Sequence, residues 1–298
     1  MKKYILIKLV LSSLIITGCD FGMDISPTSS VTEDIYWSRD SDVRQAVNAV
    51  YAEMDGRTMG LDNRTDIVYA QLTPLVPSDG TVTGTWNRYY RGIRKANAVI
   101  NNAGQAEIGN MQLIERYVAE ARFLRAYYYT QLTSLWGDVP LITETFDIND
   151  HRGRTEKETV VNFIIDELDD IIDSHLLEVS YGSGDVGRAT HGAAQSLKAR
   201  VALRNERWEV ARDAALAVIE SGVYSLYPDY EGLFQYEGQN SSEVIFDRQY
   251  ADDGQRYDAF GHTASSLGGS SSVEPYMAPI FFLGLMKRNT TLKILMIH

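Results

Sequence analysis

Cysteine is nearly absent from this 298-residue sequence, which contains only Cys19. A single cysteine cannot form an intramolecular disulfide, so a disulfide-stapled scaffold is excluded. Basic side chains are also scarce, because 28 Lys and Arg stand against 40 Asp and Glu, giving a formal net charge of −12. A surface of that sign repels phosphate backbones and anionic lipid, which argues against nucleic-acid binding and requires any membrane attachment to be covalent.

Recognised catalytic and metal-binding motifs are missing as well. No His-Glu-x-x-His, Gly-x-Ser-x-Gly or Walker sequence occurs, and Asp252, Asp253 and Asp258 lack the spacing of a calcium loop. The histidines are dispersed and share no predicted helix face, which favours surface or capping positions for His151, His175, His191, His262 and His298. The sequence therefore predicts no catalytic residue, no metal site and no cofactor.

The N-terminus carries an export signal. Lys2 and Lys3 precede an apolar run to Ile16, so residues 1–18 are predicted to be a lipoprotein signal peptide. The sequence Ile-Thr-Gly-Cys that ends at Cys19 resembles a bacterial lipobox, which predicts that Cys19 is the lipidated first residue of the mature protein. Residues 19–32 are rich in Ser, Thr and Asp and are predicted to form a tether.

The longest regular pattern lies at Met111–Trp136, which no Gly or Pro interrupts. Apolar residues recur there every three or four positions, the period of one helix face: Ile114, Tyr117, Ala121, Leu124, Tyr128, Leu132 and Leu135. Tyr127–Tyr129 point about 100° apart on a helix, so this helix is expected to pack between two neighbours. Gly137 and Pro140 are predicted to end it.

Shorter patterns predict further helices. Ser41 or Asp42 is predicted to cap the first, and Thr155 with Glu158 reads as a capping box for another. Thr190 is predicted to cap an alanine-rich helix, and a short link leads to a second helix whose buried face begins at Trp208. Two helices of about 14 residues joined in this way describe an antiparallel, tetratricopeptide-like hairpin. The fold class is mainly α, with irregular loops and a short strand at Glu243–Phe246.

An acidic helix raises the question of a glycosidase. Asp166, Glu167, Asp169 and Asp170 crowd one predicted helix, and glycosidases use two carboxylates that flank one bond. Neighbouring positions on a helix point in different directions, however, and a solvated helical face is the favoured interpretation.

Irregular segments supply the candidate ligand contacts. Asp55–Thr85 has no sustained period, and Ala251–Ser272 is polar and turn-rich. Aromatic rings stack on the apolar face of a sugar, while Asn and Arg satisfy its hydroxyl groups. For Trp86 the favoured interpretation is the start of a buried stripe, and for Tyr69 both interpretations stay open. The candidates are Asn63, Arg64, Tyr69 and Trp86, with Tyr250 and Tyr257 in second rank.

Several motifs in order carry a family resemblance. AEARFLRAYYYTQLTSLWGDVPLITE, preceded by WNRYYRGIRKANAVINN and followed by GRATHGAAQSLKARVAL and VIESGVYSL, resembles the signature of the SusD/RagB family. These are lipid-anchored outer-membrane proteins of Bacteroidetes that capture nutrients, mostly glycans. The resemblance implies a SusD-like helical domain at 33–250, a surface-exposed position, an oligosaccharide ligand and a TonB-dependent, SusC-like transporter as partner. It implies binding without catalysis.

The last part of the chain differs in composition. After Pro275 no acidic residue occurs, while Lys287, Arg288 and Lys293 do. Residues 251–298 are therefore expected to be an incomplete C-terminal part, left by truncation or frameshift of a longer gene. Met277–Met286 is apolar but too short to span a bilayer, and is expected to be a buried strand or a C-terminal anchor.

Two other functions compete with glycan capture. The second alternative is a helical-hairpin module that serves protein assembly alone, without sugar affinity. An exported polysaccharide hydrolase is the third alternative, because its carboxylates can lie far apart in sequence. The sequence does not name the glycan, since loop shape rather than fold selects it.

Overall fold

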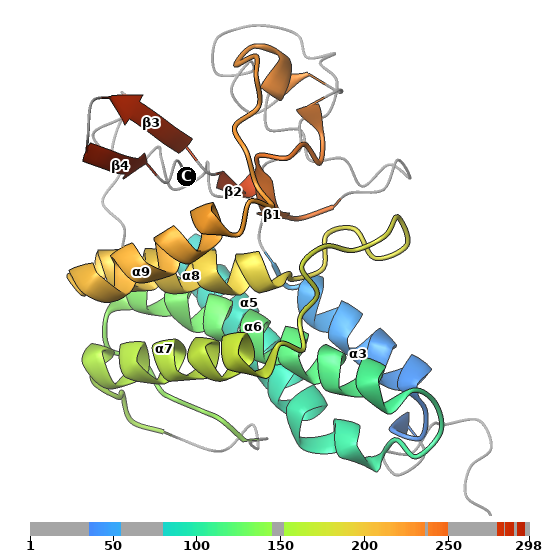
Figure 1. The fold of residues 1–298 in the computed structure, drawn as a ribbon. Coiled ribbons are helices and arrows are strands. Elements are labelled where there is room, and N and C mark those ends of the chain that lie inside the picture. The colour runs from blue at the N-terminus through green and yellow to red at the C-terminus, as the bar shows by residue number, and fades with distance from the viewer. Residues whose placement is uncertain are drawn as a thin grey trace, which may run out of the picture.

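The computed structural model describes residues 36–54, 80–144, 152–235 and 238–249, together with strand residues 279–282, 284–288 and 291–295. Its helices are α3 (Asp40–Tyr51), α5 (Gly80–Asn102), α6 (Met111–Trp136), α7 (Lys157–Ser174), α8 (His191–Arg204) and α9 (Trp208–Glu220) (Figure 1). Short 3-10 turns lie at Ala103–Gln105 and Gly232–Phe234. The mainly helical class predicted from the sequence is confirmed, whereas the predicted domain boundaries stay predictions.

Helix α6 has the bounds that the sequence predicts and forms the centre of the bundle. It packs against α3, α5, α7 and α8, and it crosses the middle of the view in green (Figure 1). Asn110 caps its start, because the side-chain oxygen accepts hydrogen bonds from the backbone N–H of Gln112 at 3.0 Å and of Leu113 at 3.4 Å. Gly137 ends it with a φ of 70°, a conformation that costs glycine little.

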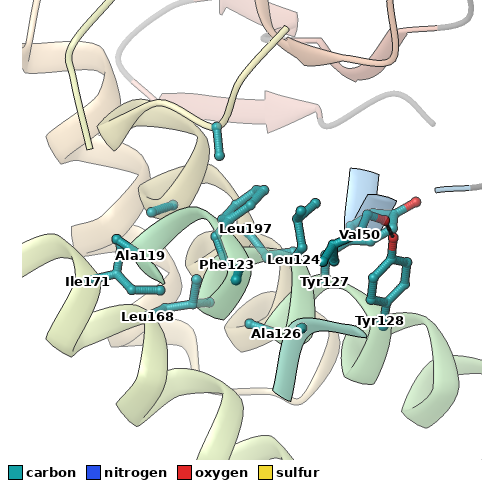
Figure 2. Close-up of a cluster of buried hydrophobic side chains, with 14 of the residues drawn as sticks. Val50, Ala119, Phe123, Leu124, Ala126, Tyr127, Tyr128, Leu168, Ile171 and Leu197 are labelled. Carbon is teal, nitrogen blue, oxygen red and sulfur yellow. Dashed lines mark hydrogen bonds between the residues drawn. The ribbon is translucent and has the colours of Figure 1, made fainter. Parts of the chain in front are cut away.

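The core is built around the middle of α6. Figure 2 shows Leu124 and Tyr128 of α6 beside Val50, while Leu168 and Ile171 of α7 lie along the same helix. All three consecutive tyrosines are buried, as a helix with more than one packed neighbour requires. The hydroxyl of Tyr128 donates to the carbonyl of Val50 at 2.6 Å, and burial raises the pKa of that phenol well above its ordinary value. The predicted burial of Leu135 is wrong: it is 43% exposed, while the next residue, Trp136, packs against Trp86, because neighbouring positions on a helix point about 100° apart.

Helices α8 and α9 form the predicted hairpin. The Thr190 side chain accepts a hydrogen bond from the backbone N–H of Ala193 at 3.1 Å, which confirms the predicted cap. Small side chains meet where the two helices cross, among them Ala199 and Ala214, and they let the backbones approach closely. The prediction that Trp208 is buried is wrong, since this first residue of α9 is 61% exposed beside the connecting turn.

Two predicted helix caps are also wrong. Helix α3 starts after Arg39, and the Asp42 carboxylate accepts a hydrogen bond from the Arg39 backbone N–H at 2.9 Å, so Asp42 lies inside the first turn. Helix α7 starts after Glu156, whose side chain makes no capping bond, and the Asp138 carboxylate accepts a hydrogen bond from the Lys157 backbone N–H at 2.9 Å. Thr155 instead pairs with Val139 in an isolated β-bridge, a contact between distant segments that the local sequence does not show.

The strands are short and pair in twos. Strand β1 (Val244–Asp247) pairs antiparallel with β2 (Pro279–Phe282), and β3 (Gly284–Arg288) pairs antiparallel with β4 (Thr291–Leu295). The strand predicted at Glu243–Phe246 is thus confirmed within one residue. Residues 80–85, predicted to be irregular, belong to α5 instead. In the part of the chain that the structure describes, no helix has the length and apolarity needed to cross a bilayer.

Candidate functional site

Most of the predicted ligand contacts lie outside the described residues. Asn63, Arg64 and Tyr69 fall between the described residues 54 and 80, and Tyr250 and Tyr257 fall after residue 249. The predicted lipidation site Cys19 precedes the first described residue. The structure does, however, show where the two candidate-bearing segments start.

The flanks of these two segments are joined by a hydrogen bond. The Arg248 guanidinium Nη1 donates to the carbonyl of Met54 at 2.6 Å, and Met54 is 1% exposed. Beside it, the Glu53 carboxylate lies 2.7 Å from Lys95 Nζ and 3.2 Å from Arg91 Nη2, which fixes the end of α3 against α5. Met54 and Arg248 are 194 residues apart in the sequence. Their hydrogen bond therefore brings together the described residues that precede segments 55–79 and 250–278.

Trp86 is the candidate that the structure describes. It lies in the N-terminal half of α5, half-buried, with its ring centroid 5.2 Å from that of Trp136 and 4.9 Å from that of Tyr90. The hydroxyl of Tyr90 donates to the carbonyl of Pro140 at 2.8 Å. Trp86 thus packs against the core at the end of α6, as the buried-stripe interpretation requires, and keeps part of its indole accessible.

Glu120 of the signature motif lies in a buried ionic cluster. It is fully buried, with Arg188 Nη1 at 2.7 Å, Arg116 Nε at 3.3 Å and the Tyr51 hydroxyl at 3.0 Å. Asp185 extends the cluster at 2.7 Å from Arg188 Nε. Burial acts to raise the pKa of Asp185, but the neighbouring guanidinium groups outweigh it and hold that pKa below its ordinary value. The cluster ties α6, α3 and the start of α8 together and has the character of a structural ion-pair network.

A second buried cluster corrects the interpretation of the acidic helix. Glu167 is 3% exposed and lies 2.8 Å from Arg122 Nε and 2.9 Å from Arg125 Nε, so it does not belong to a solvated face. Asn97 accepts a hydrogen bond from Arg125 Nη1 at 2.8 Å, which adds α5 to the cluster. Asp170, by contrast, is exposed and meets Arg122 at the surface. The sequence signal that was missed is the presence of Arg122 and Arg125 on α6, a helix predicted to pack between two neighbours.

Two histidines that the sequence separates come together in the fold. His175 ends α7 in a left-handed conformation with a φ of 52°, and His191 begins α8. Their rings stack with centroids 5.6 Å apart. Within the described ranges, no group of three or more His, Cys, Asp or Glu side chains is arranged to hold a metal ion.

Comparison with known proteins gives a consistent result. Residues 23–203 match the model of a SusD-like family described as "Starch-binding associating with outer membrane". SusD-like protein P25 of Formosa agariphila is 27% identical over 265 residues, which cover 79% of this chain and 50% of the relative. A SusD-like protein of Bacteroides ovatus is 32% identical over 211 residues, which cover 66% of this chain and 37% of the relative. The chain spans about half the length of the curated relatives it matches.

Solved structures share the fold. A SusD-like protein of Bacteroides fragilis aligns with a TM-score of 0.64 and 27% identity over 74% of this chain and 47% of that one. Surface glycan-binding protein A of Bacteroides thetaiotaomicron, solved in complex with laminarihexaose, aligns with a TM-score of 0.61 and 22% identity. The alignment covers 72% of this chain and 50% of that one. The fold described above is therefore similar to about half of each of these proteins.

Proposed function

The chain belongs to the SusD-like family, and on that premise we propose that it is a lipid-anchored binding protein of the outer membrane that captures oligosaccharides without cleaving them. The family match over residues 23–203 is the observation that carries this proposal. In the proposed cycle the protein holds a glycan at the cell surface and passes it to a TonB-dependent, SusC-like transporter. Such a transfer needs a difference in affinity between two states and no bond chemistry.

The proposed sugar contacts are those named from the sequence. Asn63, Arg64 and Tyr69 come from one segment, and Tyr250 and Tyr257 from the other. The hydrogen bond between Arg248 and the Met54 carbonyl supports a joint role, because it fixes the flanks of both segments at one place. In this proposal aromatic rings stack on the sugar and the polar side chains take its hydroxyl groups.

Trp86 takes a supporting role in the proposed site. Its contacts with Trp136 and Tyr90 hold the indole at the N-terminal half of α5, the helix that follows residues 55–79. Because the side chain is only half-buried, one part of it can contact a ligand while the other part packs.

Membrane attachment in this proposal is covalent, through Cys19 and a tether at 19–32. The acidic composition supports this, since a negative surface gains nothing from anionic headgroups.

The exposed Trp208 and Leu203, at the turn between α8 and α9, favour a protein contact as a second function. Exposed Trp of this kind is typical of the residues that dominate binding energy in interfaces.

Calorimetry on the full chain tests the proposal. Polysaccharides and oligosaccharides, laminarihexaose included, are titrated, and the mixtures are then chromatographed for products. We expect weak binding to at least one glycan with no new reducing ends, and Tyr69→Ala should weaken it at least about tenfold. Tyr230→Ala is the matched control, because Tyr230 is 75% exposed and lies in neither segment. Accumulating reducing ends would contradict the proposal of binding without cleavage. Unchanged affinity in Tyr69→Ala would contradict the proposed site.

A further inference from the structure

A cavity of about 180 Å³ lies between the first turns of α8 and the end of α9. Its walls come from both helices and from the segment after α9, and they are formed mainly by carbon atoms. The residues that line it include His191, Gly192, Gln195, Ala217 and Tyr224. The cavity is far from Trp86: that residue packs near the end of α6, where Ser134 meets Arg204 at the far end of α8. The 14 residues of α8 separate its ends by about 20 Å.

One wall of the cavity is a fixed aromatic ring. The hydroxyl of Tyr224 lies 3.0 Å from the Thr190 hydroxyl, and burial raises the pKa of that phenol. Gly192 provides room for the ring, because a Cβ at this position would come within 2.4 Å of it. The ring is thus held from the edge and from one side, and an aromatic surface held in this way needs no rearrangement to bind a ligand.

A polar atom beside the cavity has no partner among the described residues. Nε2 of His191 is buried and makes no hydrogen bond within the described part of the chain. A buried polar group without a partner is costly, and a ligand or water commonly supplies the missing bond. Gln195 lies one turn further along α8 and adds an amide that can both donate and accept.

The size of the cavity selects a single ring. A protein cavity of about 150 Å³ with apolar walls accommodates benzene. The present cavity is slightly larger and combines apolar walls with an aromatic ring and polar side chains. A pyranose has the matching shape, with an apolar face and an edge of hydroxyl groups. We propose that this cavity is an accessory subsite for one pyranose unit, an inference that rests on the proposed glycan-binding function.

Titration of the full chain with methyl pyranosides, followed by the amide NMR signals of Gly192 and Ala217, tests the subsite. We expect millimolar binding that shifts both signals. Ala217→Trp should reduce affinity at least about tenfold by filling the cavity, whereas Ala52→Trp, at an exposed alanine of α3's end, should not change it. Tyr224→Ala should abolish binding and Tyr224→Phe should preserve it, which separates loss of the ring from loss of the hydroxyl.

Two further measurements separate this inference from the proposed function. Leu135→Ala should leave the methyl pyranoside titration unchanged, because this exposed residue near the end of α6 lies neither in the cavity nor in the segments of the proposed glycan site. Cyclohexanol should bind at least about tenfold more weakly than the pyranosides; equal binding would overturn the assignment to a sugar. Absence of signal shifts with methyl pyranosides, while longer glycans still bind, would overturn the subsite and leave the proposed function standing. Absence of binding to every glycan would overturn both.

Discussion

Glu120 of α6 and Arg188, 68 residues later in the chain, form a buried ion pair with 2.7 Å between Oε2 and Nη1. The pair fastens the central helix to the segment that starts the α8–α9 hairpin. Both residues stand in motifs that carry the family resemblance, so these two charges have a structural use here.

Breaking the pair should strongly destabilise the protein. Glu120→Gln and Arg188→Met should each lower the free energy of unfolding by about 3–5 kcal/mol, because each leaves the other charge buried. Urea denaturation measures the change in the free energy of unfolding. The double variant should lose less stability than the sum of the losses in the two single variants. Arg212→Ala is the control, since its pair with Asp213 is exposed at the surface. A loss below about 0.5 kcal/mol in both single variants would show that the pair is not formed in solution.

Leu124 should be a core position and Leu135 a surface position on the same helix. Leu124 is fully buried, so Leu124→Ala should cost about 2–5 kcal/mol through the lost contacts and the cavity left behind. Leu135→Ala, at 43% exposure, should change stability by about 0.5 kcal/mol. Thermal unfolding of both variants checks the difference; equal effects would mean that α6 is rotated relative to the structure.

Acid should destabilise the protein through Glu53 and Asp185. Burial acts to raise the pKa of Glu53, but the bonds from Lys95 and Arg91 outweigh it and hold that pKa below its ordinary value. The pKa of Asp185 is lowered in the same way. A lowered folded pKa adds stability above the unfolded pKa of about 4, and this stability is lost as the pH falls through the folded value. Unfolding measured from about pH 6 to pH 3 should show a smaller loss in the variant Glu53→Gln/Asp185→Asn than in the natural sequence; parallel curves would contradict this assignment.

Asp247 should behave in the opposite way. It is 4% exposed in β1, and burial raises the pKa of its carboxyl group despite the opposing hydrogen bond from Gln249. A raised folded pKa means that the charged form is disfavoured in the folded state at neutral pH and that the penalty disappears on protonation. Asp247→Asn should therefore raise the free energy of unfolding at pH 7 and have little effect at pH 3. Denaturation of the variant and the natural sequence at pH 7 and at pH 3 tests this prediction. A variant less stable than the natural sequence at pH 7 would disprove it.

Cys19 should carry the proposed lipid. Cys19→Ala should abolish incorporation of radiolabelled fatty acid and move the protein from the membrane fraction to the soluble one. The control is Ser12→Ala, which changes the signal peptide without touching the cysteine. Undiminished labelling of Cys19→Ala would refute the anchor.

Most of the helical architecture and the family resemblance could be predicted from the sequence alone. The bounds of α6 follow from an uninterrupted period between Asn110 and Gly137, and the Thr190 cap and the α8–α9 hairpin follow from equally local signals. Helix periodicity and end signals depend on residues within a few positions of one another, so they can be read directly from the chain.

Which polar residues are buried, and which distant segments meet, depends instead on tertiary contacts. Glu167 belongs to an acidic stretch that predicts a solvated face, yet Arg122 and Arg125 of another helix hold it in the core. Thr155 was predicted to cap α7 but pairs with Val139, and the flanks of two separate candidate segments meet at Arg248 and Met54. The burial of a charged side chain, the capping of a helix and the position of a loop depend on partners tens of residues away. The energy of a buried ion pair or hydrogen bond exists only once folding has removed water from both partners.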